Sequence, residues 1–152
     1  MSRAFVNENA IVDDVPDRPL STNPNYVTAK GLAQIEAALD SARARYSEAQ
    51  ATGSRDALAQ CVRDVRYWSA RRANAQLVVP SSDKDTVQFG SIVTIVRDDG
   101  REQTFQIVGE DEADPTNGTI SYVSPLAMSL LRKTIGDTVS AGNSDAEIVA
   151  IR

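Results

Sequence analysis

The side chains in this chain that could do chemistry are mainly carboxylates. Residues 109–118, GEDEADPTNG, place four acids within five positions and then continue into turn-forming Pro, Asn and Gly residues. The chain has no histidine and a single cysteine, Cys61. A Ser-His or Cys-His nucleophile pair, a histidine-ligated zinc site and an internal disulfide are therefore excluded. The acidic run is thus the first candidate for a metal site, an acid/base site or a solvated loop.

The acidic run has the residue pattern of a loop between two strands. It lacks the alternating ligands and the central glycine of a calcium-binding loop. Clustered carboxylates without a neighbouring base also have no reason to reach the separated pKa values that acid/base catalysis needs. We expect a solvated connection in which Asp111, Glu112 and Asp114 have an interaction role. We predict no catalytic residue, no metal site and no cofactor, and so no enzyme.

The net charge of −5 is unevenly distributed along the chain. Residues 1–27 hold two Arg against four acids, residues 28–79 hold eight basic residues against five acids, and residues 80–152 hold six against twelve. An acidic chain is a poor candidate for tight, direct binding to duplex nucleic acid, because Lys and Arg contacts to phosphate supply most of that affinity. We expect a partner that is met through the basic middle segment.

Length and composition predict a soluble cytoplasmic protein of one or two compact units. The chain has 152 residues, and 41% of them are hydrophobic. No stretch approaches the roughly 20 apolar residues of a membrane span, and the polar start lacks the apolar run of a secretion signal. Residues 1–27 contain Pro16, Pro19 and Pro24 without sustained periodicity, so we expect an extended or partly disordered N-terminal arm.

The middle segment, residues 28–79, predicts a helical hairpin. Thr28 is a suitable N-cap, Gly53 supplies a stop, Ser54 can cap a second helix, and Pro80 follows its end. Apolar positions then repeat at spacings of 3 and 4, which is typical of an antiparallel coiled coil. The seam residues are Leu32, Ile35, Leu39, Ala42 and Tyr46 in the first helix, and Leu58, Cys61, Val65, Trp68, Arg72 and Ala75 in the second. Cys61 is therefore expected to be a core thiol.

Two arrangements of this hairpin are open, over residues 28–77. It either docks on a globular body or forms a projecting finger. The outward faces favour the finger, because they are too polar for a helix pair buried in a core. The arginines on these faces are Arg43, Arg45, Arg63, Arg66 and Arg71.

Residues 80–152 predict an α+β domain, an antiparallel sheet with one helix on it. Two β-branched runs, residues 92–96 and 104–108, flank Asp99-Gly100, a strong hairpin turn signal. A third strand is expected at 119–123, followed by a short helix with Ser124 as cap and Pro125 at its first position. Final strands at 135–139 and 147–151 are expected around a Gly142-Asn143 turn.

The motifs of these segments resemble the bacterial Gre transcript-cleavage and elongation factors. The stretches FGSIVTIV, TFQIVGEDEAD and ISYVSPLAMSLLRKTIGD occur in that order after the hairpin. The start of the hairpin, YVTAKGLAQIEAAL, is also similar to the opening helix of the family, and the arm resembles that of short GreB-like members. The matching motif positions are Gly109, Asp111, Glu112, Ala113, Asp114, Ile120, Ser121, Ser124, Pro125, Ala127, Lys133, Gly136 and Asp137.

The resemblance implies an FKBP-like C-terminal domain that docks at the rim of the RNA polymerase secondary channel, while the hairpin enters the channel. It implies RNA polymerase as partner, nucleic acid only within that complex, no membrane and a monomer. In the family, two acids in an Asp-x-x-Glu spacing at the hairpin tip help hold a second Mg²⁺, a hard cation that suits carboxylates. The corresponding positions here are Ser54 and Ala57, so both carboxylates are absent and Asp56 is the acid of the turn.

We therefore predict a polymerase-binding elongation regulator without strong transcript cleavage of its own. The expected channel contacts are the tip residues Ser54, Arg55 and Asp56, and the basic hairpin faces would be steered to acidic polymerase surfaces. One alternative is a Gre-like cleavage factor that uses Asp56. Another is an interaction module like the regulators of nucleoside diphosphate kinase. A peptidyl-prolyl isomerase follows from the FKBP-like fold alone. The predicted partner-binding residues are Arg43, Arg45, Arg63, Arg66, Asp111, Glu112, Asp114, Ser124 and Pro125.

Overall fold

A computed structural model describes residues 15–152, so the first half of the predicted arm, residues 1–14, lies outside the described residues. The chain divides into two units. One contains residues 33–75 and the arm up to Pro24; the other contains residues 25–32 and 76–152. No helix within residues 15–152 is both long and apolar enough to cross a membrane.

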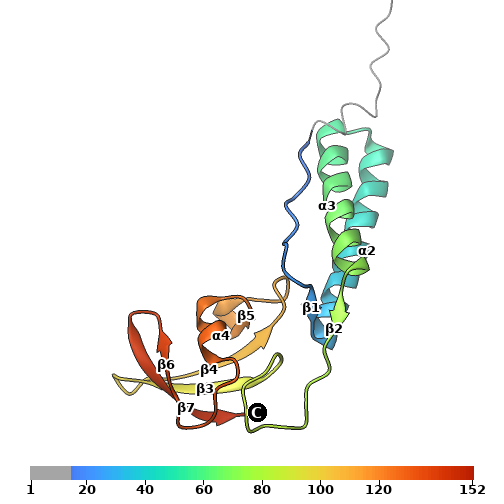
Figure 1. The fold of residues 1–152 in the computed structure, drawn as a ribbon. Coiled ribbons are helices and arrows are strands. Elements are labelled where there is room, and N and C mark those ends of the chain that lie inside the picture. The colour runs from blue at the N-terminus through green and yellow to red at the C-terminus, as the bar shows by residue number, and fades with distance from the viewer. Residues whose placement is uncertain (1–14) are drawn as a thin grey trace, which may run out of the picture. The chain divides into compact units, whose positions relative to one another are not determined.

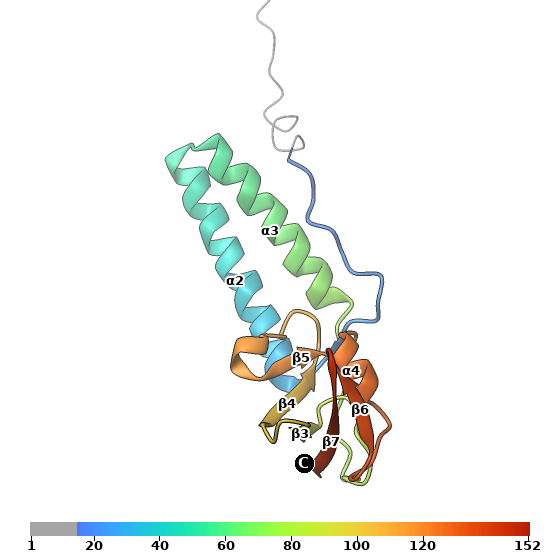
Figure 2. The ribbon, with the colours of Figure 1, turned by 90° about the vertical axis from the view of Figure 1, so that its left-hand side faces the viewer.

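The first unit is built on two helices, α2 (Ala29–Thr52) and α3 (Arg55–Ala73) (Figures 1 and 2). The predicted caps are confirmed. The Thr28 hydroxyl accepts a hydrogen bond from the Gly31 amide at 2.9 Å, and Ser54 caps α3 by accepting one from the Ala57 amide. Gly53 has φ +70°, the left-handed conformation that ends a helix and that glycine adopts without strain.

The faces between α2 and α3 bury small and aliphatic side chains. Ile35, Leu39, Ala42 and Ala49 of α2 and Ala59 of α3 are each less than 7% exposed. The prediction of which arginine of α3 is buried was wrong by one residue. Arg71, expected on the outward face, is 1% exposed, whereas Arg72, expected in the seam, is exposed and forms a 2.9 Å ion pair with Glu36. A 3-and-4 spacing cannot separate two adjacent arginines, because the long apolar stem of either one can be buried.

Two short parallel strands begin and end the hairpin, and the sequence did not indicate them. β1 (Tyr26–Val27) pairs with β2 (Gln76–Leu77). The expected helix to residue 77 was therefore too long: α3 ends at Ala73, where the Asn74 amide donates to the Ala70 carbonyl. The amides of Gln76 and Val78 instead donate to the carbonyls of Asn25 and Val27, at 2.8 and 3.0 Å.

The second unit contains a five-stranded sheet of order β5-β4-β3-β7-β6. Its strands are β3 (Ile92–Arg97), β4 (Glu102–Val108), β5 (Thr119–Ser121), β6 (Thr138–Ala141) and β7 (Ser144–Ile151). The two predicted hairpins, β3–β4 and β6–β7, are confirmed as antiparallel pairs. The expectation of an all-antiparallel sheet was wrong for one pair, because β5 runs parallel to β4. The chain between β4 and β5 contains the acidic run and a single turn of 3₁₀ helix, η1 (Pro115–Asn117). After η1 the chain enters β5, beside β4.

One hydrophobic core unites the sheet and the helix α4 (Pro125–Leu130). Ala127 and Leu130 of α4 are fully buried with side chains of the central strands, among them Val93, Ile95 and Ile148. The predicted α+β class, a helical hairpin followed by a sheet with one helix, is thus confirmed. The strand expected at 135–139 lies later, at β6, because residues 134–137 form a turn with Gly136 at φ +94° and Asp137 accepting from the Thr134 amide.

Candidate functional site

The hairpin tip, residues 53–56, is exposed throughout. Ser54, Arg55 and Asp56 all have solvent-accessible side chains, as a contact surface requires. The Ser54 hydroxyl is used to cap α3, and Asp56 lies in the first turn of that helix. A carboxylate there interacts favourably with the helix dipole. Asp56 is the one acid of the tip, so the tip offers a single carboxylate to a cation.

A shallow hollow of about 260 Å³ lies between α2 and α3 beside the tip. Cys61 is half-buried and lines it, so the thiol is less enclosed than the core position expected from its helical register. Within residues 15–152, no group of three or more His, Cys, Asp or Glu side chains is placed to hold a metal ion. The residues that line the hollow are Arg45, Glu48, Ala49, Thr52, Ala57 and Cys61.

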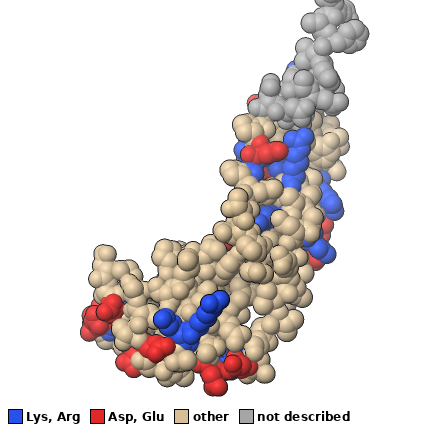
Figure 3. All heavy atoms as spheres, viewed as in Figure 1, with Lys and Arg blue, Asp and Glu red and all other residues tan. Residues whose placement is uncertain are grey.

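The four hairpin arginines predicted to bind a partner differ in their surroundings. Arg43 is exposed and forms no salt bridge with any residue of 15–152. Arg45 is exposed, 3.9 Å from the Asp64 carboxylate, and Arg66 is exposed, 3.3 Å from Asp17. Arg63 is only half-buried. On the face that Figure 3 shows, basic and acidic side chains are interspersed on the surface of this unit.

Asp114 organises the turn that follows the acidic run. Its carboxylate accepts hydrogen bonds from the Thr116 hydroxyl and the Asn117 side-chain amide, both at 2.6 Å, and from the Thr116 amide at the start of η1. The hydrogen bond from the Thr116 side chain, followed by that from Asn117, lowers the pKa of Asp114 below its usual value of 3.8. The loop is therefore a structured connection with a charged cap.

Glu112 joins the acidic run to the start of α2. The Thr28 hydroxyl donates a short hydrogen bond to Glu112 Oε1, next to the N-terminus of the helix. Two glycines permit this approach. A Cβ at Gly31 would lie 2.6 Å from Glu112 Oε1, and a Cβ at Gly109 would lie 2.3 Å from the Tyr26 carbonyl oxygen. Partner binding by Asp111, Glu112 and Asp114 stays a prediction, but Glu112 and Asp114 have intrachain contacts as well.

Ser124 and Pro125 occupy the N-terminus of α4 as predicted. The Ser124 hydroxyl accepts from the Ala127 amide at 3.3 Å, and Pro125 is exposed at the first helical position. The aromatic residues of positions 80–152, Phe89, Phe105 and Tyr122, are used in packing. Phe89 and Tyr122 form an aromatic cluster with Tyr26, with ring centroids 5.4 to 6.1 Å apart, and Phe105 packs against the core.

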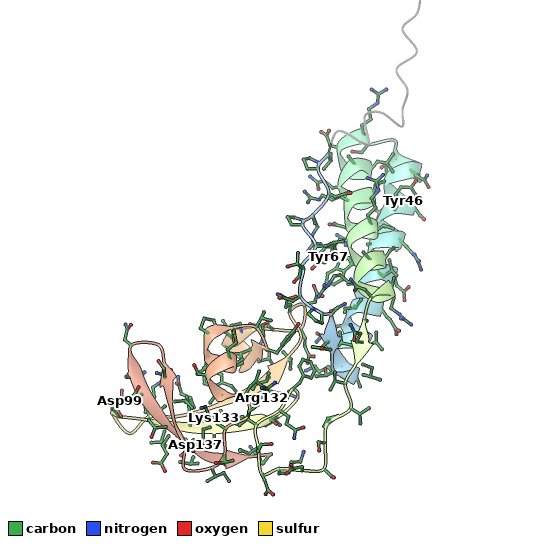
Figure 4. The ribbon with its side chains drawn as sticks, in the orientation of Figure 1. Tyr46, Tyr67, Asp99, Arg132, Lys133 and Asp137 are labelled. Carbon is green, nitrogen blue, oxygen red and sulfur yellow. The ribbon has the colours of Figure 1, made fainter. Side chains whose placement is uncertain are left out.

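Two features of the surface are not among those predicted from the sequence. Arg132 and Lys133 are exposed side by side in the turn after α4, and Arg132 has φ +69°, a strained conformation for a residue with a Cβ (Figure 4). In the other unit, Arg18 of the arm lies against Tyr67 and Trp68 of α3. The sequence contains an indication of this second feature, because the Asp17-Arg18 pair stands between two prolines in the arm segment PDRP.

Comparison with known proteins identifies the sheet unit. Residues 82–152 match the family model described as the C-terminal part of the transcription elongation factors GreA and GreB. Residues 82–152 are a Gre-type C-terminal domain. This domain includes β3 to β7 and α4, and the motifs noted at Gly109 to Asp114 and at Ser124 to Asp137 fall within it.

The curated relatives that this chain matches are named as transcription elongation factors. The chain is 40% identical over 95 residues to transcription elongation factor GreB of Neisseria meningitidis serogroup B, covering 59% of this chain and 58% of that protein. It is 45% identical over 85 residues to GreA of Helicobacter pylori, covering 52% of each. The chain therefore spans little more than half the length of the curated relatives it matches. Among solved structures, the GreA factor homolog Gfh1 of Thermus thermophilus aligns with a TM-score of 0.43 at 19% identity, over 86% of this chain and 99% of that one.

Proposed function

We propose that this chain, with its Gre-type C-terminal domain, is an RNA polymerase-binding regulator of transcription elongation. Its hairpin engages the secondary channel without supplying the acids for transcript cleavage. The observation that carries the proposal is a Gre-type C-terminal domain combined with a hairpin tip that has one carboxylate. The chain itself is not an enzyme in this proposal. Its partner is the polymerase, and it meets nucleic acid only within that complex.

The chemistry of the tip supports the absence of strong cleavage. A second Mg²⁺ at a polymerase active centre needs carboxylate ligands in addition to phosphate oxygens. At the tip, Ser54 uses its hydroxyl as a helix cap and Ala57 has no polar side chain, which leaves Asp56 alone. Glu48 lies on the other helix, beside the hollow. The tip can therefore occupy a channel, but both acids of the expected pair are absent and Asp56 is its single carboxylate.

The test restores both acids at positions where α3 tolerates them. Asp is as good an N-cap as Ser, and Glu three residues later completes a capping box, so Ser54→Asp with Ala57→Glu keeps the helix start intact. The matched control is Ser54→Asn with Ala57→Gln, which has the same shapes without the charges. RNA cleavage is measured in backtracked polymerase complexes.

We expect cleavage to be stimulated by the Asp/Glu variant and to stay at the polymerase's own rate with the parent and with the Asn/Gln control. Stimulation by the parent that disappears on Asp56→Asn would instead identify a cleavage factor that uses Asp56. Stimulation by the Asn/Gln control would show that the charges are irrelevant and would contradict the proposal.

Binding to polymerase is tested separately with charge reversal on the hairpin. Arg43 is the cleanest site, because it is exposed without a salt bridge to residues 15–152, whereas reversing Arg66 would also break its ion pair with Asp17. We expect Arg43→Glu to weaken polymerase binding, with a larger difference at low salt than at high salt. Arg43→Gln is the control for loss without reversal. Equal binding by all three proteins at low salt would argue against electrostatic docking.

A further inference from the structure

The described part of the arm, residues 15–24, runs along α3 in both views and belongs to the same unit (Figures 1 and 2). The Arg18 guanidinium lies 3.8 Å from the centre of the Tyr67 ring and 5.5 Å from that of Trp68. The same guanidinium is 3.4 Å from the Asp64 carboxylate. Its neighbour Asp17 is 3.3 Å from Arg66. Two adjacent arm residues of opposite charge thus each meet a complementary partner on one helix.

The sequence of the arm favours the extended conformation needed for this contact. Pro16 and Pro19 flank the Asp17-Arg18 pair. Proline fixes its own φ near −65° and keeps the preceding residue out of the helical region, so Val15 and Arg18 are also held extended. A proline-flanked segment therefore loses little conformational entropy on binding, which is the reason that proline-rich peptides are common ligands of aromatic surfaces.

The surface of α3 that receives the arm is preformed by the hairpin. Asp64, Tyr67 and Trp68 are spaced by three and four residues, which places them on one helix face. Tyr67 and Trp68 pack edge to face with their centroids 4.9 Å apart, and Tyr67 lies between α3 and the arm (Figure 4). Arg45 of α2 lies 3.9 Å from the second oxygen of Asp64, so that carboxylate faces an arginine of each of two segments, the arm and α2.

We propose that Asp64, Arg66, Tyr67 and Trp68 form a binding site for an extended, proline-flanked Asp-Arg segment of a protein, with the arm as its resident ligand. A partner that presents the same chemistry displaces the arm. This site is separate from the polymerase contacts proposed above, and neither assay below contains polymerase. The two proposals can therefore fail independently.

The strengths of the contacts explain why the arm is displaceable. The side chains of Arg66 and Asp17 are 48% and 63% exposed, so their ion pair is screened by water and contributes little. The cation–π contact of Arg18 is the larger contribution, and it is also modest. The arm stays bound mainly because it is tethered, which gives it an effective concentration of roughly millimolar order. A free segment that makes additional contacts can bind tightly enough to compete with the arm at that effective concentration.

The first experiment uses the single tryptophan of the chain, Trp68, as a reporter. In the full chain, the arm is released by the double substitution Asp17→Ala with Arg18→Ala, and quenching of Trp68 fluorescence by acrylamide is compared with that of the parent. We expect stronger quenching in the variant. Arg55→Ala at the exposed tip is the matched control and should leave quenching unchanged. Equal quenching in the parent and the arm variant would overturn the proposal.

The second experiment supplies the ligand in trans. A synthetic peptide of residues 15–24 is titrated into the arm variant, next to a peptide of identical composition in which Asp and Arg exchange places. We expect the first peptide to restore the parental quenching. The exchanged peptide should bind about tenfold more weakly, because it loses the two ion pairs and the cation–π contact. The parent, with its site occupied, should respond only at higher peptide concentration. Equal binding of both peptides, or no binding of either at several millimolar, would refute a site for this sequence.

Discussion

Substitution of Gly109 tests the packing beneath the β1–β2 pair, because this glycine lies against the Tyr26 carbonyl group. A Cβ at this position would lie 2.3 Å from the Tyr26 carbonyl oxygen, whereas carbon and oxygen atoms normally approach to about 3.3 Å. Gly109→Ala therefore requires a backbone shift of about 1 Å, because neither group is a flexible side chain. The shift acts on β1, whose Val27 is buried and whose pairing with β2 depends on residues 25–27.

The expected cost is about 2 kcal/mol, within the range of overpacked sites. That loss corresponds to a roughly thirtyfold increase in the opening equilibrium of the β1–β2 pair. Hydrogen exchange measured on the amides of Gln76 and Val78 reports it, because these amides donate to the Asn25 and Val27 carbonyls. We expect both amides to exchange about thirtyfold faster in Gly109→Ala than in the parent.

Gly31→Ala is the matched control, since its Cβ meets the end of a flexible side chain. The nearest atom is Glu112 Oε1 at 2.6 Å, and that side chain can rotate away. The loss of its hydrogen bond with Thr28 costs about 1 kcal/mol, while alanine in place of glycine in a helix gains about the same amount. Exchange in Gly31→Ala should therefore change by less than about fivefold. Unchanged exchange in Gly109→Ala, or an equal effect of both substitutions, would refute the steric argument.

Three further predictions concern the stability of each unit. The pKa of Asp114 is lowered in the fold, so its hydrogen bonds stabilise the fold at pH values above the unfolded pKa of 3.8. This stabilisation is lost as the pH falls through the lower pKa of the folded state. The acid unfolding of Asp114→Asn, followed by circular dichroism, should therefore be less steep below about pH 4. Ile35→Ala removes a side chain that is 1% exposed and should destabilise the hairpin by about 2–5 kcal/mol in urea unfolding followed by Trp68 fluorescence. Arg97→Ala removes hydrogen bonds to the Gln103 side chain and the Ala141 carbonyl and should lower thermal stability by about 1–3 kcal/mol, with Arg101→Ala, whose ion pair is local and exposed, as the unaffected control.

Local signals in the sequence predicted the elements well where one residue type has one physical role. Ser54 and Ser124 cap helices, Gly53 ends one, and Gly100 and Gly142 form the turns of the two hairpins. Each of these effects depends on a backbone conformation or a hydrogen bond within a few residues. The helical period of the hairpin similarly reflects burial of one face.

Contacts between segments far apart in the sequence were not predicted, because no local pattern encodes them. Two residues are too few to show the alternation of a strand, so β1 and β2 were assigned to the arm and the helix. The parallel pairing of β5 depends on the path of the acidic loop and not on its own three residues. The role of Glu112 at the start of α2 likewise depends on a partner 84 positions away.

The parallel pairing of β1 with β2 has a consequence for how this helical insertion can vary. Parallel neighbours cannot be joined by a tight turn and need a long crossover, which α2 and α3 together provide. Because both ends of that crossover are fastened to each other, equal numbers of residues can be removed from or added to the two helices while the closure at Tyr26 and Gln76 is kept. A seven-residue step in each helix preserves the seam and changes the length by about 10 Å. The length of the helical hairpin can therefore change while the pairing of β1 with β2 is kept.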